Sequence, residues 1–169
     1  PQDDVWNLVL SPGRATNVEL LSRASRGTSG ALYLRNALEI SEDRSFQVVS
    51  PQDVSGPQAL EQRHVVLLNE RPFPSGATGA RLDEWVRAGG GLIVVAGERG
   101  GWPPDAPDLF PGRLGGVVDR DGNRGERLVG LDYDHPVFEV FRGARQGDFA
   151  SARFYRARSF QVEESDSVR

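Results

Sequence analysis

The chain of 169 residues contains no cysteine and no methionine, and it has only two histidines. The lack of cysteine excludes disulfides, thiolate metal sites and cysteine nucleophiles, and it leaves the redox compartment open. The longest apolar run, residues 91–97, is far shorter than the roughly 20 residues of a membrane-spanning helix. No charged-then-apolar signal segment opens the chain. We therefore expect no membrane contact by this fragment itself.

The composition is that of a globular domain, with 38% hydrophobic and 26% charged residues and a net charge of -4. A single domain of this size buries about two thirds of its unfolded surface. The basic residues are spread along the chain, which argues against a nucleic-acid-binding stripe. The chain begins with Pro-Gln-Asp-Asp and stops just after a strand-like run, so we expect it to be a piece of a longer polypeptide.

Short apolar runs alternate with amphipathic segments over the first hundred residues. The predicted strands are residues 5–11, 16–21, 46–50, 65–69 and 92–96. The predicted helices are residues 30–40, a short turn at 58–62, and a third segment preceded by Ser75 and Thr78 and ended by Gly89-Gly90-Gly91. The continuous apolar runs at 65–69 and 92–96 are typical of buried parallel strands. The pattern predicts an α/β fold with an open, mostly parallel sheet and flanking helices.

The amino-acid composition changes after residue 97. Glycine and proline are dense as far as residue 116, which predicts loops, and residues 119–126 resemble a polar hairpin loop. The remaining ordered candidates are residues 128–131, 137–141 and 154–162. The last of these alternates enough to predict an antiparallel strand, and hence an antiparallel C-terminal extension.

Ligands of open α/β sheets bind at the carboxyl ends of the strands. The residues at those ends are the candidate ligand-binding residues Asn69, Glu70, Gly97, Glu98 and Arg99. Hydrolytic or amide-transfer chemistry needs Ser, Cys or Asp on the turn after a central strand, with a histidine nearby. Gly97 has no side chain and Glu98 is a poor nucleophile, so we predict no covalent catalysis at this turn.

The two histidines offer little catalytic support. His64 precedes the apolar run 65–69, at the sheet end opposite to the carboxyl edge, and we interpret it as a surface or edge residue. His135 stands beside Asp132 and Asp134, a group that can form either an ordered turn or a metal site. The spacing matches no zinc pattern and no third ligand is evident, so the turn is favoured, with Asp134 or His135 capping the next helix.

The remaining signals have plain structural explanations. The triple glycine at 89–91 lies after a helix and before a strand, the wrong order for a dinucleotide-binding loop. Neither a metal nor an organic cofactor is therefore predicted. Aromatic and arginine side chains are frequent after residue 100, a mixture typical of a core edge with solvated charge or of a protein-facing surface. We favour the core edge and keep the interface as the alternative.

Several longer motifs carry a family resemblance. They are A-L-Y-L-R-N-A-L at 31–38, V-V-L-L-N-E-R-P-F-P-S-G at 65–76, L-D-E-W-V-R-A-G-G-G-L-I-V-V-A-G-E-R at 82–99, G-L-D-Y-D-H-P-V-F-E-V-F-R at 130–142 and G-D-F-A-S-A-R-F-Y-R at 147–156. Together they resemble the class I glutamine amidotransferase-like domain of bacterial aerotolerance-regulator-type membrane proteins. Those proteins have two amino-terminal membrane helices and a von Willebrand factor A domain.

The resemblance implies a domain organisation and a flavodoxin-like fold. Residues 1–14 resemble the end of a preceding β-rich segment, and residues 15–169 resemble the amidotransferase-like domain, truncated before the last strands and helix of the family. The strand at 16–21 then becomes the first strand of the sheet. An open sheet edge near residues 154–162 would have to be paired with a neighbour or mobile.

The resemblance also implies a function. In active amidotransferases the catalytic cysteine stands at the position of Gly97, so the resemblance implies a retained fold without the chemistry. We expect a non-catalytic module that binds a protein or a ligand, on the extracytoplasmic, periplasmic side of a membrane-anchored protein. Its expected partners are other domains of the same chain and envelope proteins. The alternative is a cryptic hydrolase or ligand-processing site that uses Glu70, Glu98 and His135.

Overall fold

A computed structural model gives the fold of the protein. The residues it describes are 15–23, 30–40, 45–97, 100–104, 106–109, 112–119, 125–127, 130, 132–136, 138 and 152–162. The chain divides into two compact units, Pro1–Leu109 and Phe110–Arg169. Each unit contains its own sheet, and the candidate residues at the carboxyl ends of the parallel strands belong to the first unit.

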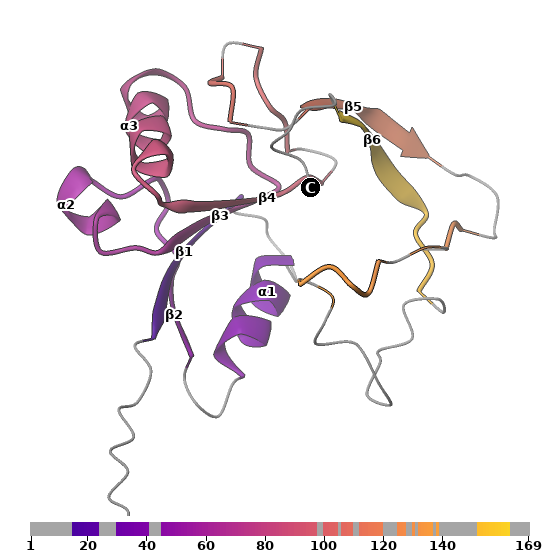
Figure 1. Cartoon of the computed structure of the whole chain (residues 1–169), viewed down its shortest axis with the longest axis horizontal. Helices are drawn as coiled ribbons and strands as arrows, with labels where there is room; N and C mark the ends of the chain where they lie inside the picture. Colours follow the sequence, from indigo (N-terminus) through magenta and orange to yellow (C-terminus); the bar gives the residue numbers. More distant parts are fainter. Residues whose placement is uncertain are drawn as a thin grey trace, which may run out of the picture. The chain divides into compact units, whose positions relative to one another are not determined.

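The first unit is built on a four-stranded parallel sheet (Figure 1). Its strands are β1 (Thr16–Ser22), β2 (Phe46–Val49), β3 (Val65–Asn69) and β4 (Gly91–Val95), in the order β2-β1-β3-β4. Val18 of β1 lies opposite Val48 and Val65 of its two neighbours, which fixes the register. The α/β prediction is therefore confirmed.

Three helices connect these strands and cover both faces of the sheet (Figure 1). They are α1 (Gly30–Glu39), α2 (Pro57–Leu60) and α3 (Gly76–Arg87). The short turn predicted at residues 58–62 is α2, shifted toward the N-terminus. Pro57 occupies the first turn of α2, where its missing N–H is not needed. Gly89 ends the segment that contains α3. Its φ is +106, a backbone conformation that glycine adopts without strain.

Side chains alternate along each strand, so every strand supplies both faces of the sheet. On the α2 and α3 face, Leu21, Val66 and Leu68 pack with Leu60 and Leu82. On the α1 face, the core consists of Val18, Leu20, Val48 and Leu67, with Leu34 and Leu38 of α1 packed against it. The central strands β1 and β3 are thus buried on both sides, which explains their nearly continuous apolar sequence.

The second unit contains a two-stranded antiparallel sheet of β5 (Gly112–Asp119) and β6 (Arg156–Val162). The register shifts between Leu114 and Val117, where a bulge contains Gly115 and Gly116. Asp119 and Arg156 form a salt bridge of 3.1 Å at the end of the ribbon. The antiparallel strand predicted at residues 154–162 is confirmed, and its paired edge is β5.

Three predictions about elements were wrong. The glycine-rich stretch that predicts loops contains strand β5, because glycines at a bulge and in a twisted ribbon do not prevent pairing. Thr78 lies inside α3, whose N-cap is Ser75. β4 is not buried on both faces, since Ile93 is 49% exposed.

Other predicted segments lie outside the described residues. They are residues 1–14, residues 120–124 of the polar loop, and most of 128–131 and 137–141.

Candidate functional site

The sheet has one topological switch point, between β1 and β3. The chain leaves β1 toward β2 on one side and then crosses to β3 on the other, so the loops after β1 and β3 diverge. Such a divergence opens a crevice at the carboxyl ends of the two strands. In this protein the strands end at Ser22 and Asn69, which lie opposite each other in the sheet.

Ser22 and Asn69 are joined by a hydrogen bond across the switch point. The Asn69 side-chain Nδ2 donates to Ser22 Oγ at 3.0 Å. Asn69 is only 6% exposed, one of two buried polar or charged residues among those described. An amide so deeply buried at the end of a core strand is unusual, because burying a polar group costs free energy unless it is hydrogen-bonded.

The first residue of α1 lies directly beside this pair. A Cβ placed on Gly30 would be 3.7 Å from Asn69 Nδ2, an ordinary van der Waals distance. The first turn of α1 contains no acidic residue. Arg23 follows Ser22 at once in the sequence, and its side chain is exposed. The carboxyl ends of β1 and β3 therefore bring together a hydroxyl, an amide and the first residue of α1.

Glu70 and Gly97 face each other on the other side of β3. A Cβ placed on Gly97 would lie 2.5 Å from both Cγ and Oε1 of Glu70, so the Glu70 side chain occupies the space above Gly97. Glu70 is exposed and has φ 51, the only positive φ outside glycine in the described part of the chain. A non-glycine residue in this region is strained, and such strain is frequent at functional sites.

The structure therefore brings together three of the five residues predicted at the carboxyl edge. Asn69 and Glu70 are consecutive, and Gly97 lies against Glu70. Glu98 and Arg99 lie outside the described residues. Gly100 lies close by, since its Cβ position is 3.4 Å from Glu70 Cα.

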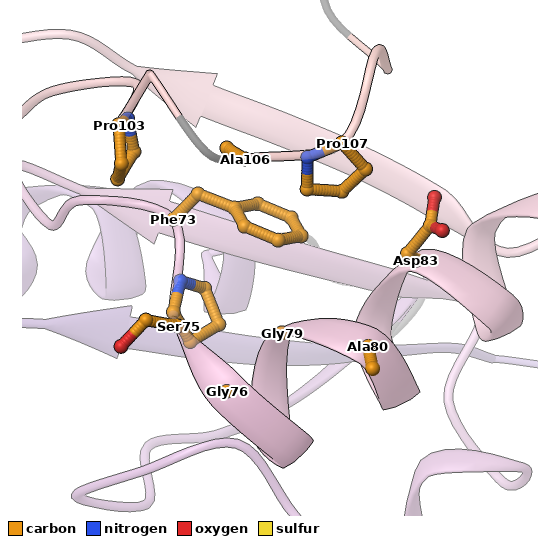
Figure 2. Close-up of a pocket in the computed structure, with 10 residues that line it drawn as sticks. Phe73, Ser75, Gly76, Gly79, Ala80, Asp83, Pro103, Ala106 and Pro107 are labelled. Carbon is orange, nitrogen blue, oxygen red and sulfur yellow. The ribbon is translucent and has the colours of Figure 1, made fainter.

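A separate hollow of about 260 Å³ opens beside α3 in the same unit (Figure 2). It is lined by Phe73, Pro74, Ser75, Gly76, Gly79, Ala80, Asp83, Pro103, Ala106 and Pro107. Figure 2 shows the Phe73 ring between α3 and the segment that carries Ala106 and Pro107. Phe73 is itself fixed by Trp102, with ring centroids 4.7 Å apart. None of the residues predicted at the carboxyl edge lines this hollow.

The turn around His135 is ordered by Asp132. The Asp132 side chain accepts a hydrogen bond from the Asp134 backbone N–H at 2.9 Å, and its carbonyl accepts one from the His135 N–H at 3.2 Å. A turn is thus present, and Asp132 accepts two of its hydrogen bonds. The helix that Asp134 or His135 is predicted to cap lies largely outside the described residues. Among the described residues, no group of three or more His, Cys, Asp or Glu side chains could hold a metal ion.

His64 has a structural role at the amino end of the sheet. Its Nδ1 accepts a hydrogen bond of 2.9 Å from the Asn17 backbone N–H, and its own N–H donates to the Asn17 carbonyl. This pair ties β3 to β1 at the edge opposite to the switch point. The interpretation of His64 as an edge residue agrees with this arrangement.

Two residues of interest were not found from the sequence. Ser22 ends a strand in a polar stretch and has no local motif, so only its partner Asn69 reveals it. Glu19 lies in the middle of β1 with its side chain fully buried. Glu19 Oε1 accepts from the Ser55 N–H at 2.9 Å, and Oε2 lies 3.6 Å from Arg63 Nε. The sequence signal that could have identified Glu19 is its place as an acidic residue within an apolar run.

Comparisons with known protein families, with curated proteins and with solved structures find no match to this chain. In the part of the chain that the structure describes, no helix is both long and apolar enough to span a membrane.

Proposed function

We propose that this chain is a non-catalytic, amidotransferase-like domain that binds a protein or a small ligand within a membrane-anchored bacterial protein. Its place is the extracytoplasmic side of the membrane, and its partners are other domains of the same chain and envelope proteins. The sequence motifs that resemble the aerotolerance-regulator family support this assignment. The single observation that carries the non-catalytic part is the packing of Glu70 over Gly97.

A nucleophilic elbow needs a reactive side chain at the end of its strand, held where substrate can reach it. At the corresponding turn here, Gly97 supplies no side chain, and the Glu70 side chain fills the space that a Cβ would occupy. A nucleophile at position 97 would therefore require Glu70 to move. The arrangement therefore supports a binding role for this turn in place of covalent catalysis.

The polarity of the same edge supports a binding role. Asn69 presents a buried amide and Glu70 an exposed carboxylate at the carboxyl end of the central strand β3. Polar groups that converge at a switch point are the usual means by which open α/β sheets hold ligands.

Crosslinking of the intact membrane protein, with and without residues 15–169, tests the binding role. We expect a defined set of envelope proteins to be captured by the whole protein and lost on deletion of the domain. A matched pair of variants in the whole protein sharpens the test: Glu70→Lys reverses the charge at the candidate edge, and Glu61→Lys reverses it at an exposed position after α2. Capture that survives both the deletion and Glu70→Lys would contradict the proposal.

One observation favours a hydrolase as a second candidate. Glu70 is exposed, carries a carboxylate and is held at φ 51, the kind of strained backbone found at catalytic residues. In this alternative Glu70 serves as the acid–base group of the first unit. Two assays measure hydrolysis: the release of ammonia from glutamine and the release of p-nitrophenol from p-nitrophenyl acetate. Hydrolysis that is lost in Glu70→Gln and kept in Glu61→Gln would establish the enzyme and refute the non-catalytic proposal.

A further inference from the structure

We propose that the hollow between α3 and residues 103–107 binds a basic side chain, lysine or arginine, presented by an extended segment of a partner polypeptide. The Asp83 carboxylate holds the charged end of that side chain, and the rings of Phe73 and the lining prolines hold its methylene groups. The hollow is separate from the carboxyl-edge residues of the proposed binding role, so this inference goes beyond the proposed function.

The walls of the hollow are fixed by contacts within the chain. The Phe73 N–H donates to the Gly101 carbonyl at 3.3 Å, and the Phe73 and Trp102 rings lie 4.7 Å apart. The Ala106 N–H donates to the Pro103 carbonyl at 3.0 Å and so closes a turn in the opposite wall. A site that is already ordered loses less conformational entropy when it binds a partner.

These walls offer few hydrogen-bond donors to a ligand. Three of the lining residues are prolines, which have no N–H. The N–H groups of Gly79 and Ala106 are already bonded to carbonyl groups of the chain. Figure 2 shows the Ser75 hydroxyl directed away from the Phe73 ring. The walls therefore suit methylene groups better than an anion.

Asp83 supplies the charge of the hollow. Among the described residues that line the hollow, Asp83 alone carries a charged side chain, and that side chain is 23% exposed. Its Oδ1 accepts from Arg87 Nε at 2.9 Å, while no hydrogen bond within the described part of the chain reaches Oδ2. A carboxylate can accept about four hydrogen bonds, so a ligand cation can share Asp83 with the exposed Arg87.

The charges around the hollow favour a cationic ligand. Asp108, which follows Pro107, is exposed and adds a second acidic residue on that side. Arg81 of α3 is engaged elsewhere, since its guanidinium donates to the Ser55 carbonyl at 3.3 Å. A purely apolar ligand would remove the Asp83 carboxylate from water without giving it a new partner, which costs free energy. Lysine and arginine combine the apolar stem and the charged end that this hollow requires.

The size of the hollow favours a side chain over a larger ligand. Its volume of about 260 Å³ is below the roughly 300–1,000 Å³ of typical small-molecule sites. A second hollow of about 190 Å³ shares Phe73, Pro74 and Ser75 with it, so the two adjoin. Adjoining hollows of this size suit two side chains of one extended peptide segment, a mode of recognition in which side-chain pockets give specificity.

Titration of the full chain of 169 residues with blocked pentapeptides tests the inference. The peptides are Leu-Ala-Lys-Ala-Leu and its analogues with Arg, Gln or Glu at the centre, n-butylamine is the free amine, and backbone ¹H–¹⁵N chemical shifts are followed. We expect saturable shifts of the Gly79, Asp83 and Ala106 amides with the lysine or arginine peptide, which should bind about 10-fold more tightly than the glutamine peptide.

Three outcomes of this titration overturn the inference. They are the absence of any saturable shift with the lysine and arginine peptides, equal affinity for the glutamine peptide, and n-butylamine that binds as tightly as the lysine peptide. The last result would assign the hollow to free amines and not to a polypeptide.

Charge variants of α3 test the role of Asp83. Asp83→Asn should weaken binding of the lysine peptide by about 10-fold, as expected for loss of a charge-assisted hydrogen bond. Glu84→Gln removes the same charge at the next, exposed position and should leave binding within about 2-fold. Arg87→Gln should strengthen binding by about 3-fold, because Asp83 loses the cation that it now shares.

A second pair of variants tests the hollow itself without a change of charge. Ala80→Leu fills the hollow and should weaken binding by about 10-fold, whereas Ala77→Leu places the same side chain at an exposed position outside the lining. Circular dichroism checks the fold of each variant.

Equal weakening by Asp83→Asn and Glu84→Gln, or no weakening by Asp83→Asn and Ala80→Leu, would overturn the inference. The crosslinking test of the proposed function changes Glu70, which does not line this hollow, so failure of one proposal can be told from failure of the other.

Discussion

Glu19 shows how one residue can hold a connection to the sheet. Its carboxylate lies in the core of the first unit and receives the Ser55 N–H and the guanidinium of Arg63. Both partners belong to the connection between β2 and β3 that contains α2. Oε2 and Arg63 Nε have no hydrogen-bond partner, so the pair is ionic without a well-formed hydrogen bond. The carboxylate therefore anchors this connection to β1.

Glu19→Gln tests this anchor. The amide oxygen can still accept from the Ser55 N–H, whereas the Arg63 side chain, 19% exposed, loses its counter-charge. We expect a loss of about 2 kcal/mol in the free energy of unfolding, below the usual range for a broken buried pair because Arg63 is partly solvated. Urea denaturation measures it, with Glu61→Gln as the surface control. A loss under about 0.5 kcal/mol would show that the pair contributes little.

Strain at Glu70 makes a second residue-scale prediction. Its φ of 51 is easily adopted by glycine and poorly by other residues, so Glu70→Gly should stabilise the protein by about 1 kcal/mol despite the entropy of the unfolded chain. Glu70→Ala is the control, since it removes the same carboxylate and keeps the Cβ that causes the strain. Urea denaturation of both variants measures the difference. Equal stability of the two would mean that the backbone carries no such strain.

At this scale the sequence identifies some groups of the site and misses others. Asn69, Glu70 and Gly97 could be predicted because each follows a strongly apolar strand. Ser22 could not, because its importance depends on β1 lying beside β3, a non-local pairing that no local pattern reveals. The burial of Glu19 escaped for the same reason, since the connection that covers it comes more than thirty residues later.

The element α3 is held on the sheet by a small set of side chains. Leu82 is fully buried, and Trp85 and Val86 pack at the margin of the same core. The Trp85 ring also covers Gly90, where a Cβ would come within 2.4 Å of it. The glycines after α3 therefore end the helix and also make room for the indole.

Trp85→Ala should remove this packing and cost about 3 kcal/mol, the lower part of the range for large aromatic truncations, because the ring is only partly buried. The measurement is urea denaturation followed by far-UV circular dichroism. Tyr33→Ala on α1 is the matched control: that ring is 66% exposed, so its loss should cost little. A cost under about 1 kcal/mol for Trp85→Ala would show that α3 is anchored by other residues.

Elements were predictable where their period was clear. The four parallel strands and the three helices follow from apolar runs and amphipathic spacing within about two residues at their ends. β5 was not predictable, because its glycines at 112, 115 and 116 give it a composition typical of a loop. The exposed side of β4 was also missed, because an apolar run alone does not show whether a strand is covered on one face or on two.

At the scale of the whole molecule, the chain carries two units of unequal kind. The first has a four-stranded sheet covered by helices on both faces, and the second has a two-stranded ribbon. Two-stranded ribbons are marginally stable in water, whereas a sheet with packed helices has an independent core. The tryptophans at positions 6, 85 and 102 all belong to the first unit, Pro1–Leu109. Tryptophan fluorescence is therefore a selective probe of that unit.

Two variants should separate the stabilities of these units. Leu82→Ala opens a cavity in the core of the first unit, so we expect its free energy of unfolding to fall by about 3 kcal/mol. The midpoint of the tryptophan fluorescence transition in urea should fall accordingly. Gly112→Ala places a Cβ 2.2 Å from the Gln161 carbonyl oxygen, a backbone atom that cannot step aside. It should weaken the ribbon by about 2 kcal/mol and speed amide hydrogen exchange in β5 and β6.

The decisive comparison is the effect of each variant on the unit that it does not alter. Gly112→Ala should leave the fluorescence transition unchanged, and Leu82→Ala should leave exchange in β6 unchanged under native conditions, because the strand pairs of each unit lie within it. If Gly112→Ala lowered the fluorescence midpoint as much as Leu82→Ala does, the chain would unfold as one cooperative body. Stability would then be a property of the whole molecule, and the ribbon would be a structural part of the α/β domain.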